Sequence, residues 1–90
     1  MPQLVKYRSR TEITTEILEA AKERLTKTQI MYKAYLSYSQ LKEYLALLTE
    51  NQLLSYNQAE RVYRTTEKGN KLVAMYQKMN LLTGDMKIQA

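Results

Sequence analysis

The polar side chains of residues 37–43, in the run SYSQLKE, are of the types that recognise nucleic-acid bases. A glutamine amide can pair with adenine through two hydrogen bonds, a lysine can donate to guanine or to phosphate, and a serine hydroxyl can reach either. A glutamate would accept from cytosine where it reaches a base and would repel the phosphate backbone elsewhere. The candidate base-reading residues are therefore Ser37, Tyr38, Ser39, Gln40, Lys42 and Glu43.

Two of these residues have an alternative, structural role. Gln40 follows Ser37 by three positions, which is the spacing of a capping box, and its side chain would then fold back on the start of its own helix. Tyr38 would contact a phosphate or a thymine methyl group in one interpretation, and would lie over the preceding helix in the other. The sequence leaves both pairs of alternatives open.

Basic residues in several segments are candidates for contacts to phosphate. Fourteen Lys and Arg residues against nine Asp and Glu residues give a net charge of +5, and the isoelectric point is near 9.5. A small domain with this charge favours a polyanionic partner such as nucleic acid. The predicted phosphate-binding residues are Lys6, Arg8, Arg10, Lys27, Lys33, Arg61 and Arg64.

The missing residue types exclude several kinds of chemistry. The 90 residues include no Cys and no His, which excludes disulfide scaffolds, zinc fingers, iron–sulfur sites and histidine general bases. With scattered carboxylates and no Gly-rich phosphate loop, we expect no enzyme, no metal and no cofactor. The longest apolar runs, such as 45–48, are too short for a transmembrane helix or a signal peptide, so we expect a cytoplasmic protein.

Start signals and periodicity predict the helices that carry these residues. The capping-box pair Ser9 and Glu12, followed by apolar residues at helical intervals, predicts a helix over 10–24. The same hydroxyl start with an amide three positions later occurs twice more, and predicts helices over 27–34 and 38–51.

The connection between the second and third predicted helices is very short. Only Tyr35, Leu36 and Ser37 separate them, which is too few residues to hold two helices parallel. With Leu36 pointing inward, the connection suits a helix-turn-helix in which the helices cross at a steep angle.

The residues after position 51 predict a β-hairpin. Strand-like residues at 53–56 and 61–65 flank a four-residue loop. Symmetric closure of this loop pairs Leu54 with Tyr63 on the core side and leaves Arg64 on the other side.

A last helix is predicted over 67–82, after Thr66, and Gly84 ends it. Its apolar stripe is broader than the core of one small domain needs, so we expect its second half to bury against a second copy of the chain. The predicted dimer interface comprises Leu72, Met75, Tyr76, Met79 and Leu82.

These elements give a mainly α fold with a small β-hairpin. Three helices, a hairpin and a final helix, with Leu25 and Thr26 as a short third strand, have the order of a winged helix-turn-helix with a C-terminal dimerisation helix. The expected organisation is a basic flexible arm at 1–8, the winged domain at 9–66, the dimerisation helix at 67–83 and a tail at 84–90.

Two runs of the sequence resemble a known family. KTQIMYKAYLSYSQLKEYLALLTENQLL, followed by YRTTEKG, is similar to the archaeal winged-helix family of small basic crenarchaeal nucleoid proteins and archaellum-regulator-type regulators. The resemblance covers roughly residues 9–82, and it implies binding of double-stranded DNA and a homodimer through antiparallel last helices. Tyr35 stands where such members usually have Asn, and Gln52 stands where a Gly commonly follows the third helix.

We therefore predict a homodimeric DNA-binding protein, either a transcriptional regulator or a nucleoid-associated protein. A protein-interaction module would carry an acidic or apolar surface on the third helix, whereas Ser39, Gln40 and Lys42 favour DNA. An RNA-binding winged helix would use exposed aromatic residues to stack on bases, and Tyr35 and Tyr38 are candidates for that role.

Overall fold

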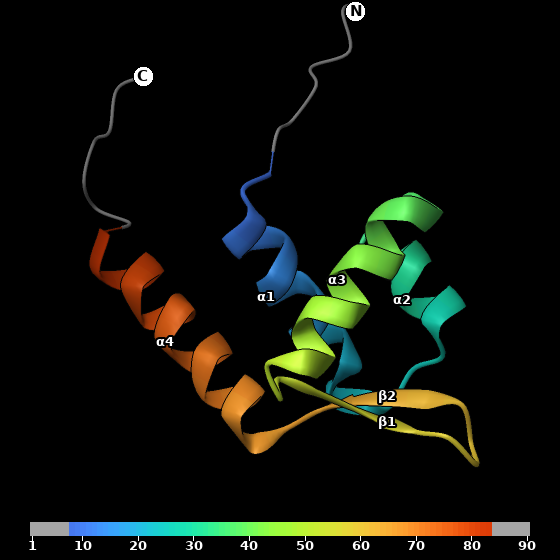
Figure 1. The fold of residues 1–90 in the computed structure, drawn as a ribbon. Coiled ribbons are helices and arrows are strands. Elements are labelled where there is room, and N and C mark those ends of the chain that lie inside the picture. Colours follow the sequence, from blue (N-terminus) through green and yellow to red (C-terminus); the bar gives the residue numbers. More distant parts are fainter. Residues whose placement is uncertain (1–7, 84–90) are drawn as a thin grey trace, which may run out of the picture.

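The computed structural model describes residues 8–83 and places a hairpin and α4 beside three packed helices (Figure 1). The predicted helices and the hairpin are confirmed, except that the first α-helix ends at Ala20 and a 3-10 turn replaces its predicted last turn up to 24. The expected arm up to position 7, with Lys6, and the Gly84 helix end lie outside the described residues. The elements in chain order are α1 (Arg10–Ala20), the 3-10 turn η1 (Ala21–Glu23), α2 (Lys27–Lys33), α3 (Tyr38–Glu50), β1 (Leu54–Asn57), β2 (Val62–Thr65) and α4 (Glu67–Thr83).

Capping boxes start the first three helices, as the sequence predicts. In each box the cap hydroxyl accepts from the backbone N–H three residues later, and that residue's side chain accepts from the backbone N–H of the cap. The pairs are Ser9 with Glu12, Thr26 with Gln29, and Ser37 with Gln40.

One hydrophobic core joins these elements. Its largest fully buried side chains come from α1, α2, α3, β1 and α4, and burying each such side chain contributes about 1.5–3 kcal/mol. Leu36 is buried between α2 and α3, which confirms the predicted helix-turn-helix connection. The fully buried large side chains are Ile17, Leu18, Ile30, Leu41, Leu48, Leu54 and Val73.

The hairpin register differs from the predicted one by two residues. Leu54 pairs with Thr65 instead of Tyr63, and Tyr56 pairs with Tyr63. The reason is the way in which Asn57 closes the turn. The side-chain oxygen of Asn57 accepts from the Glu60 amide at 2.9 Å, and the backbone carbonyl of Asn57 accepts from the Arg61 amide at 2.6 Å. Asn57 therefore belongs to β1.

Because side chains alternate between the two faces of a strand, a shift of two residues leaves the faces unchanged. Leu54 is buried and Tyr63 packs against the core, while Arg64 is exposed on the opposite face. The predicted facing of the hairpin is therefore correct although the predicted pairing is wrong.

The predicted third strand is reduced to a single bridge. The backbone of Leu25 donates to the carbonyl of Tyr63 at 3.0 Å and accepts from its amide at 2.7 Å. Thr26 does not extend this bridge, because it is the N-cap of α2. The bridge ties the end of η1 to β2.

Four joints between elements contain a residue with positive φ that is not glycine. They are Arg24, Tyr35, Gln52 and Arg61, with φ between 55° and 62°. Residues with a Cβ adopt this left-handed conformation at a cost, and Gly and Asn tolerate it best. Tyr35 and Gln52 are the two residues that depart from the family pattern. Each stands at a position with positive φ, a conformation that favours the Asn or the Gly that the family usually has there.

Helix α4 continues from β2 and lies along α1, at the edge of the fold away from α2 (Figure 1). Val73 is fully buried, and the Gln77 amide donates to the Glu19 carboxylate at 2.6 Å. Tyr76 is half-buried and borders a hollow together with residues of α1. No helix within residues 8–83 combines the length and the apolar character needed to cross a membrane.

The outer side of α4 carries apolar residues at helical spacing. Met75, Met79 and Leu82 are 62%, 60% and 71% exposed, and Leu72 is half-buried at the same side. We refer to these four residues as the α4 ridge.

Candidate nucleic-acid interface

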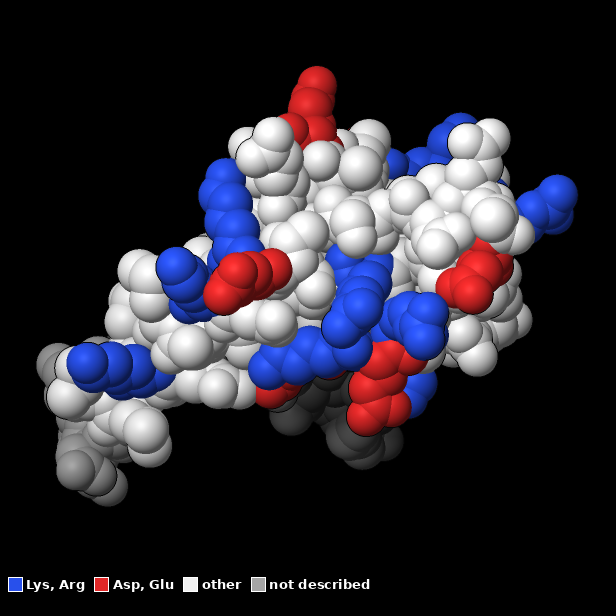
Figure 2. Space-filling view, turned by 90° about the horizontal axis from the view of Figure 1, so that it is seen from below, with Lys and Arg blue, Asp and Glu red and all other residues white. Residues whose placement is uncertain are grey.

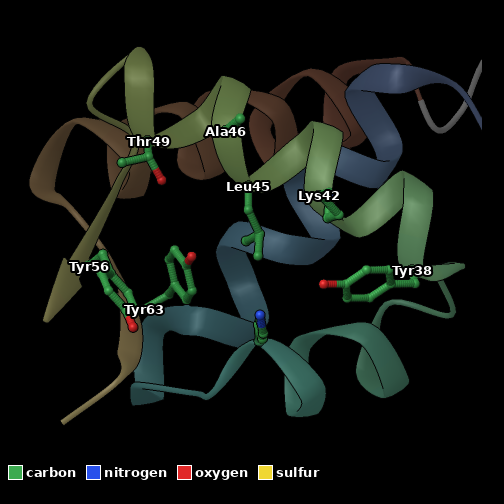
Figure 3. Close-up of a pocket in the computed structure, with 8 residues that line it drawn as sticks. Tyr38, Lys42, Leu45, Ala46, Thr49, Tyr56 and Tyr63 are labelled. Atoms are coloured by element: carbon green, nitrogen blue, oxygen red, sulfur yellow. The ribbon is translucent and has the colours of Figure 1, made fainter. Parts of the chain in front are cut away.

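Helix α3 has two exposed sides that differ in chemistry. Tyr38, Lys42 and Thr49 follow one another at helical spacing along the side that faces the hairpin (Figure 3). Ser39 and Glu43 lie on the outermost side of the helix, which is opposite the core-facing residues and exposed to solvent. The side toward the hairpin is basic and aromatic, whereas the outermost side carries an acidic residue.

A groove with a volume of about 380 Å³ separates α3 from the hairpin. In Figure 3, Tyr38 and Lys42 lie toward one end of it, and Thr49, Tyr56 and Tyr63 lie toward the other. The lining combines two lysines, three tyrosines and a small apolar floor. Its residues are Lys27, Tyr38, Lys42, Leu45, Ala46, Thr49, Tyr56 and Tyr63.

Tyr38 brings two ammonium groups together at this groove. The Lys27 Nζ lies 5.9 Å from the centroid of the Tyr38 ring, and the Lys42 Nζ lies 5.6 Å from it. Both distances are within the range of a cation–π interaction. The ring thus lies beside the first residue of α2, as the structural interpretation of Tyr38 expects, and it is still 55% exposed.

A tyrosine pair forms the hairpin wall of the groove. The rings of Tyr56 and Tyr63 have centroids 4.6 Å apart and are tilted by 40°. Burial raises the pKa of Tyr63, and the neighbouring Tyr56 raises it further. Both influences favour the protonated form of the Tyr63 hydroxyl, which can donate a hydrogen bond.

A second hollow of about 380 Å³ continues the groove toward the tip of the hairpin. Lys27, Tyr56 and Tyr63 line both hollows, and Arg61 is added at the tip. Lys42, Lys27 and Arg61 thereby border one continuous surface, which we call the basic groove. In the view from below, several Lys and Arg side chains gather near the middle of the face, with acidic side chains next to them (Figure 2).

Four of the predicted phosphate-binding residues lie outside the basic groove. Arg8 forms an ion pair with Glu16 and donates to the carbonyls of Ala34 at 2.7 Å and Tyr35 at 3.0 Å. These contacts engage its guanidinium within the protein and tie the start of α1 to the helix-turn-helix connection.

The other three are Arg10, Lys33 and Arg64. The Arg10 guanidinium lies 5.8 Å from the ring centroid of Tyr44, on the core-facing side of α3. Lys33 stands at the last residue of α2, at the opposite end of that helix from Lys27. Arg64 pairs with Ser55, and the alternation along β2 places its side chain on the hairpin face opposite to that of Tyr63.

The capping box also accounts for two predicted base-reading residues. The Gln40 Oε1 accepts from the Ser37 amide at 3.0 Å, and the Ser37 hydroxyl accepts from the Gln40 amide at 3.2 Å. The structural alternative for Gln40 is thus present in the folded chain. Of the six candidates, Tyr38 and Lys42 line the basic groove.

The sequence prediction did not single out Thr49, Tyr56 or Tyr63 as site residues. Tyr56 and Tyr63 become neighbours only in the observed hairpin register, and no spacing rule applied to the predicted register brings them opposite each other. Also unforeseen is an exposed ion pair between Arg24 and Glu60 at 3.2 Å, which links the end of η1 to the hairpin tip. Within residues 8–83, no cluster of three acidic side chains is arranged to hold a metal ion.

Comparisons with known proteins agree with this architecture. The profile of a family described as winged helix-turn-helix matches residues 7–84. The crystal structure of Sso10a-2, a DNA-binding protein from Sulfolobus solfataricus, superposes with a TM-score of 0.69 at 21% identity, over 91% of this chain and 100% of that one. A mutant of ZitR from Lactococcus lactis gives 0.57 at 18% identity, over 97% and 71% of the two chains. No curated protein matches the sequence.

Proposed function

Because the chain belongs to the winged helix-turn-helix family, we propose that it binds double-stranded DNA with the start of α3 in the major groove and the hairpin against the backbone. The observation that carries the proposal is the basic groove, where Lys27, Lys42 and Arg61 come from three separate elements to one surface. The similarity to Sso10a-2, a DNA-binding protein, supports the same function.

The charges of α3 favour entry by its N-terminal end. Lys42 and Glu43 are neighbours in the first half of the helix, and Glu50 is its last residue. If the whole length of α3 lay along the major groove of the DNA, both carboxylates would approach the DNA backbone and repel its phosphates. Insertion of the first turns places Ser39 nearest the bases and Lys42 beside the phosphates that border them, and it keeps Glu50 outside.

We assign the remaining candidates by their position. Lys27 and Arg61 contact phosphates on the two sides of the basic groove, and Arg10, Lys33 and Arg64 add weaker electrostatic attraction from its surroundings. Gln40 reads a base only if its side chain leaves the capping box, at a cost of about 0.5–1.5 kcal/mol for the lost hydrogen bond from the Ser37 amide. Tyr38 and Ser39 are the neutral residues at the point of entry.

The functional unit in this proposal is a homodimer formed through the α4 ridge. Three large apolar side chains of the ridge are exposed on one side of the helix, and a second copy of the ridge would remove them from water. Tyr76, which was predicted for the interface, instead lies half-buried beside α1 and would border the contact. Sedimentation at tens of micromolar protein tests this, and a monomer at that concentration would rule the dimer out.

A titration of duplex DNA over a series of salt concentrations tests the binding proposal. If each protomer neutralises about five phosphates, log affinity falls with log salt at a slope of about −4.5 per protomer. Lys27→Ala and Lys42→Ala each weaken binding about five- to tenfold and reduce the slope by about 1. Lys71→Ala on α4 is the matched control, because it removes the same charge away from the basic groove. A slope near zero excludes DNA as the partner.

The proposed role is that of a non-enzymatic regulator or nucleoid-associated protein. Comparing a random duplex with genomic DNA from the region upstream of the protein's own gene separates the two. A regulator binds the genomic fragment selectively, and an architectural protein binds both equally with steep salt dependence.

A further inference from the structure

Tyr38 occupies the position where two helices bring their lysines together. Lys42 lies one helical turn after it on α3, and Lys27 is the first residue of α2. The ring contacts both ammonium groups, at 5.6 Å and 5.9 Å from its centroid, while more than half of its own surface stays exposed. The Tyr38 ring of α3 is thus in contact with a lysine of its own helix and with a lysine of α2 at the mouth of the groove.

The chemistry of this arrangement differs from that of three separate surface residues. Two ammonium groups held near each other repel, and long lysine side chains on a surface normally move among many rotamers. The negative face of an aromatic ring attracts cations, so it offsets part of the repulsion and restricts both side chains. Each ammonium group therefore already has a contact to the same ring before any ligand arrives.

From this geometry we infer that Tyr38 is a positioning residue, whose ring holds Lys27 and Lys42 together as a preorganised pair for neighbouring phosphates of one DNA strand. The inference rests on the proposed function, and it adds a role for the ring itself in place of a direct contact by the hydroxyl. Lysine side chains that are already restricted in the free protein lose less conformational entropy when they bind phosphate, so the entropic cost of DNA binding is smaller.

Two substitutions separate the ring from the hydroxyl. Tyr38→Phe keeps a ring that attracts cations, and Tyr38→Leu keeps an apolar side chain without one. Because an exposed cation–π contact corresponds to a factor of about two to five in an equilibrium, loss of two contacts weakens duplex binding about four- to 25-fold in Tyr38→Leu. Tyr38→Phe binds within about twofold of the wild type. Thermal unfolding of both variants identifies any loss caused by misfolding.

A double-mutant cycle shows whether Tyr38 acts through the lysines. In a Lys27→Ala, Lys42→Ala background, Tyr38→Leu has nothing left to position and causes no further loss of affinity. A direct readout in the free protein is the NMR shift of the lysine ε-methylene protons. The ring moves these signals of Lys27 and Lys42 in the wild type and in Tyr38→Phe, and both signals return to ordinary lysine positions in Tyr38→Leu.

The outcomes separate this inference from the proposed function. Equal loss of affinity in Tyr38→Phe and Tyr38→Leu overturns the positioning role, because it assigns the contact to the hydroxyl. Wild-type affinity in Tyr38→Leu, with weak binding by the lysine variants, overturns the inference and leaves the proposed function standing. Wild-type affinity in the lysine variants as well overturns both.

Discussion

The joint between the hairpin and α4, residues 65–69, lies at the open end of the hairpin, whereas the basic groove extends toward its tip. The two regions are built in opposite ways. In the joint, side chains bond to the protein's own backbone. The Thr65 hydroxyl donates to the buried carbonyl of Leu18, and the Thr66 hydroxyl donates to the carbonyl of Gln52 at 2.7 Å and accepts from the Gly69 amide at 3.0 Å.

The basic groove has the reverse character. Lys27, Lys42 and Arg61 are exposed, and the contacts that hold the lysines are cation–π interactions with a single ring. Such contacts are weaker than hydrogen bonds to buried carbonyls. The joint therefore maintains the fold, and the groove keeps polar groups available for a partner. Substitutions in the two regions should change different properties.

The largest effect is expected at Gly69 in the joint. A Cβ at this position would lie 2.5 Å from the carbonyl oxygen of Leu53 and 2.6 Å from the Thr65 methyl group. Because the nearest atom is backbone, Gly69→Ala must move α4 away from the end of α3, and we expect a loss of about 3 kcal/mol in unfolding free energy. Urea denaturation measures it, with the exposed neighbour Asn70→Ala as control. A loss below about 0.5 kcal/mol would contradict the close approach.

Thr65→Val should come next. It keeps the shape of a buried side chain but removes the hydroxyl that bonds to the Leu18 carbonyl, at a cost of about 1–2 kcal/mol. Thr65→Ser, which keeps the hydroxyl, should retain the bond. If valine and serine destabilise the protein equally, the hydrogen bond is not what holds β2 to α1. DNA affinity measured well below the melting temperature should be unchanged.

Arg61→Asn tests the groove side of the comparison. Asparagine tolerates the positive φ at this position, so the substitution removes the charge without straining the turn. We expect unchanged stability, duplex binding weaker by about two- to fivefold, and a salt slope reduced by about 0.9. Arg64→Asn, on the opposite face of the hairpin, should have the smaller effect. The reverse ranking would mean that the other face of the hairpin meets the DNA.

The smallest effect is expected at the end of α3. Gln52 has a φ of 62°, where glycine is less strained, so Gln52→Gly should raise the unfolding free energy by about 0.5 kcal/mol despite the greater flexibility of the unfolded chain. Thermal unfolding at two denaturant concentrations resolves a change of this size. Destabilisation would show that the Gln52 side chain contributes more than its backbone costs.

The same contrast explains what the sequence could predict. The start of a helix is a local feature, because a hydroxyl and the carboxylate or amide side chain three residues later determine it. The predicted starts of α1, α2 and α3 are correct. The alternation of side chains along each strand predicts which hairpin residues face the core, and this prediction is also correct. The register was wrong because it depends on how Asn57 and Arg61 close the turn, and the absence of glycine there gave no signal of a left-handed residue.

Site residues were harder to predict than the fold, because a groove depends on which elements meet in space. Lys27 and Lys42 were proposed for separate reasons, and nothing in the sequence shows that one tyrosine ring lies near both. Arg8 shows the opposite case. Its charge predicts a phosphate contact, and the sequence gives no sign that its guanidinium also donates to the carbonyls of Ala34 and Tyr35.

The capping boxes have a consequence for the electrostatic field around the protein. A helix carries about half a positive charge at its N-terminus, from the aligned dipoles of its peptide groups. α1 neutralises part of this charge with the carboxylate of Glu12, and α4 has Glu67 in its first turn. α2 and α3 are closed by the amides of Gln29 and Gln40, and neither has an acidic residue in its first turn. The two helices that begin nearest Tyr38 therefore keep their positive ends unneutralised, and the backbone itself adds to the attraction for a polyanion.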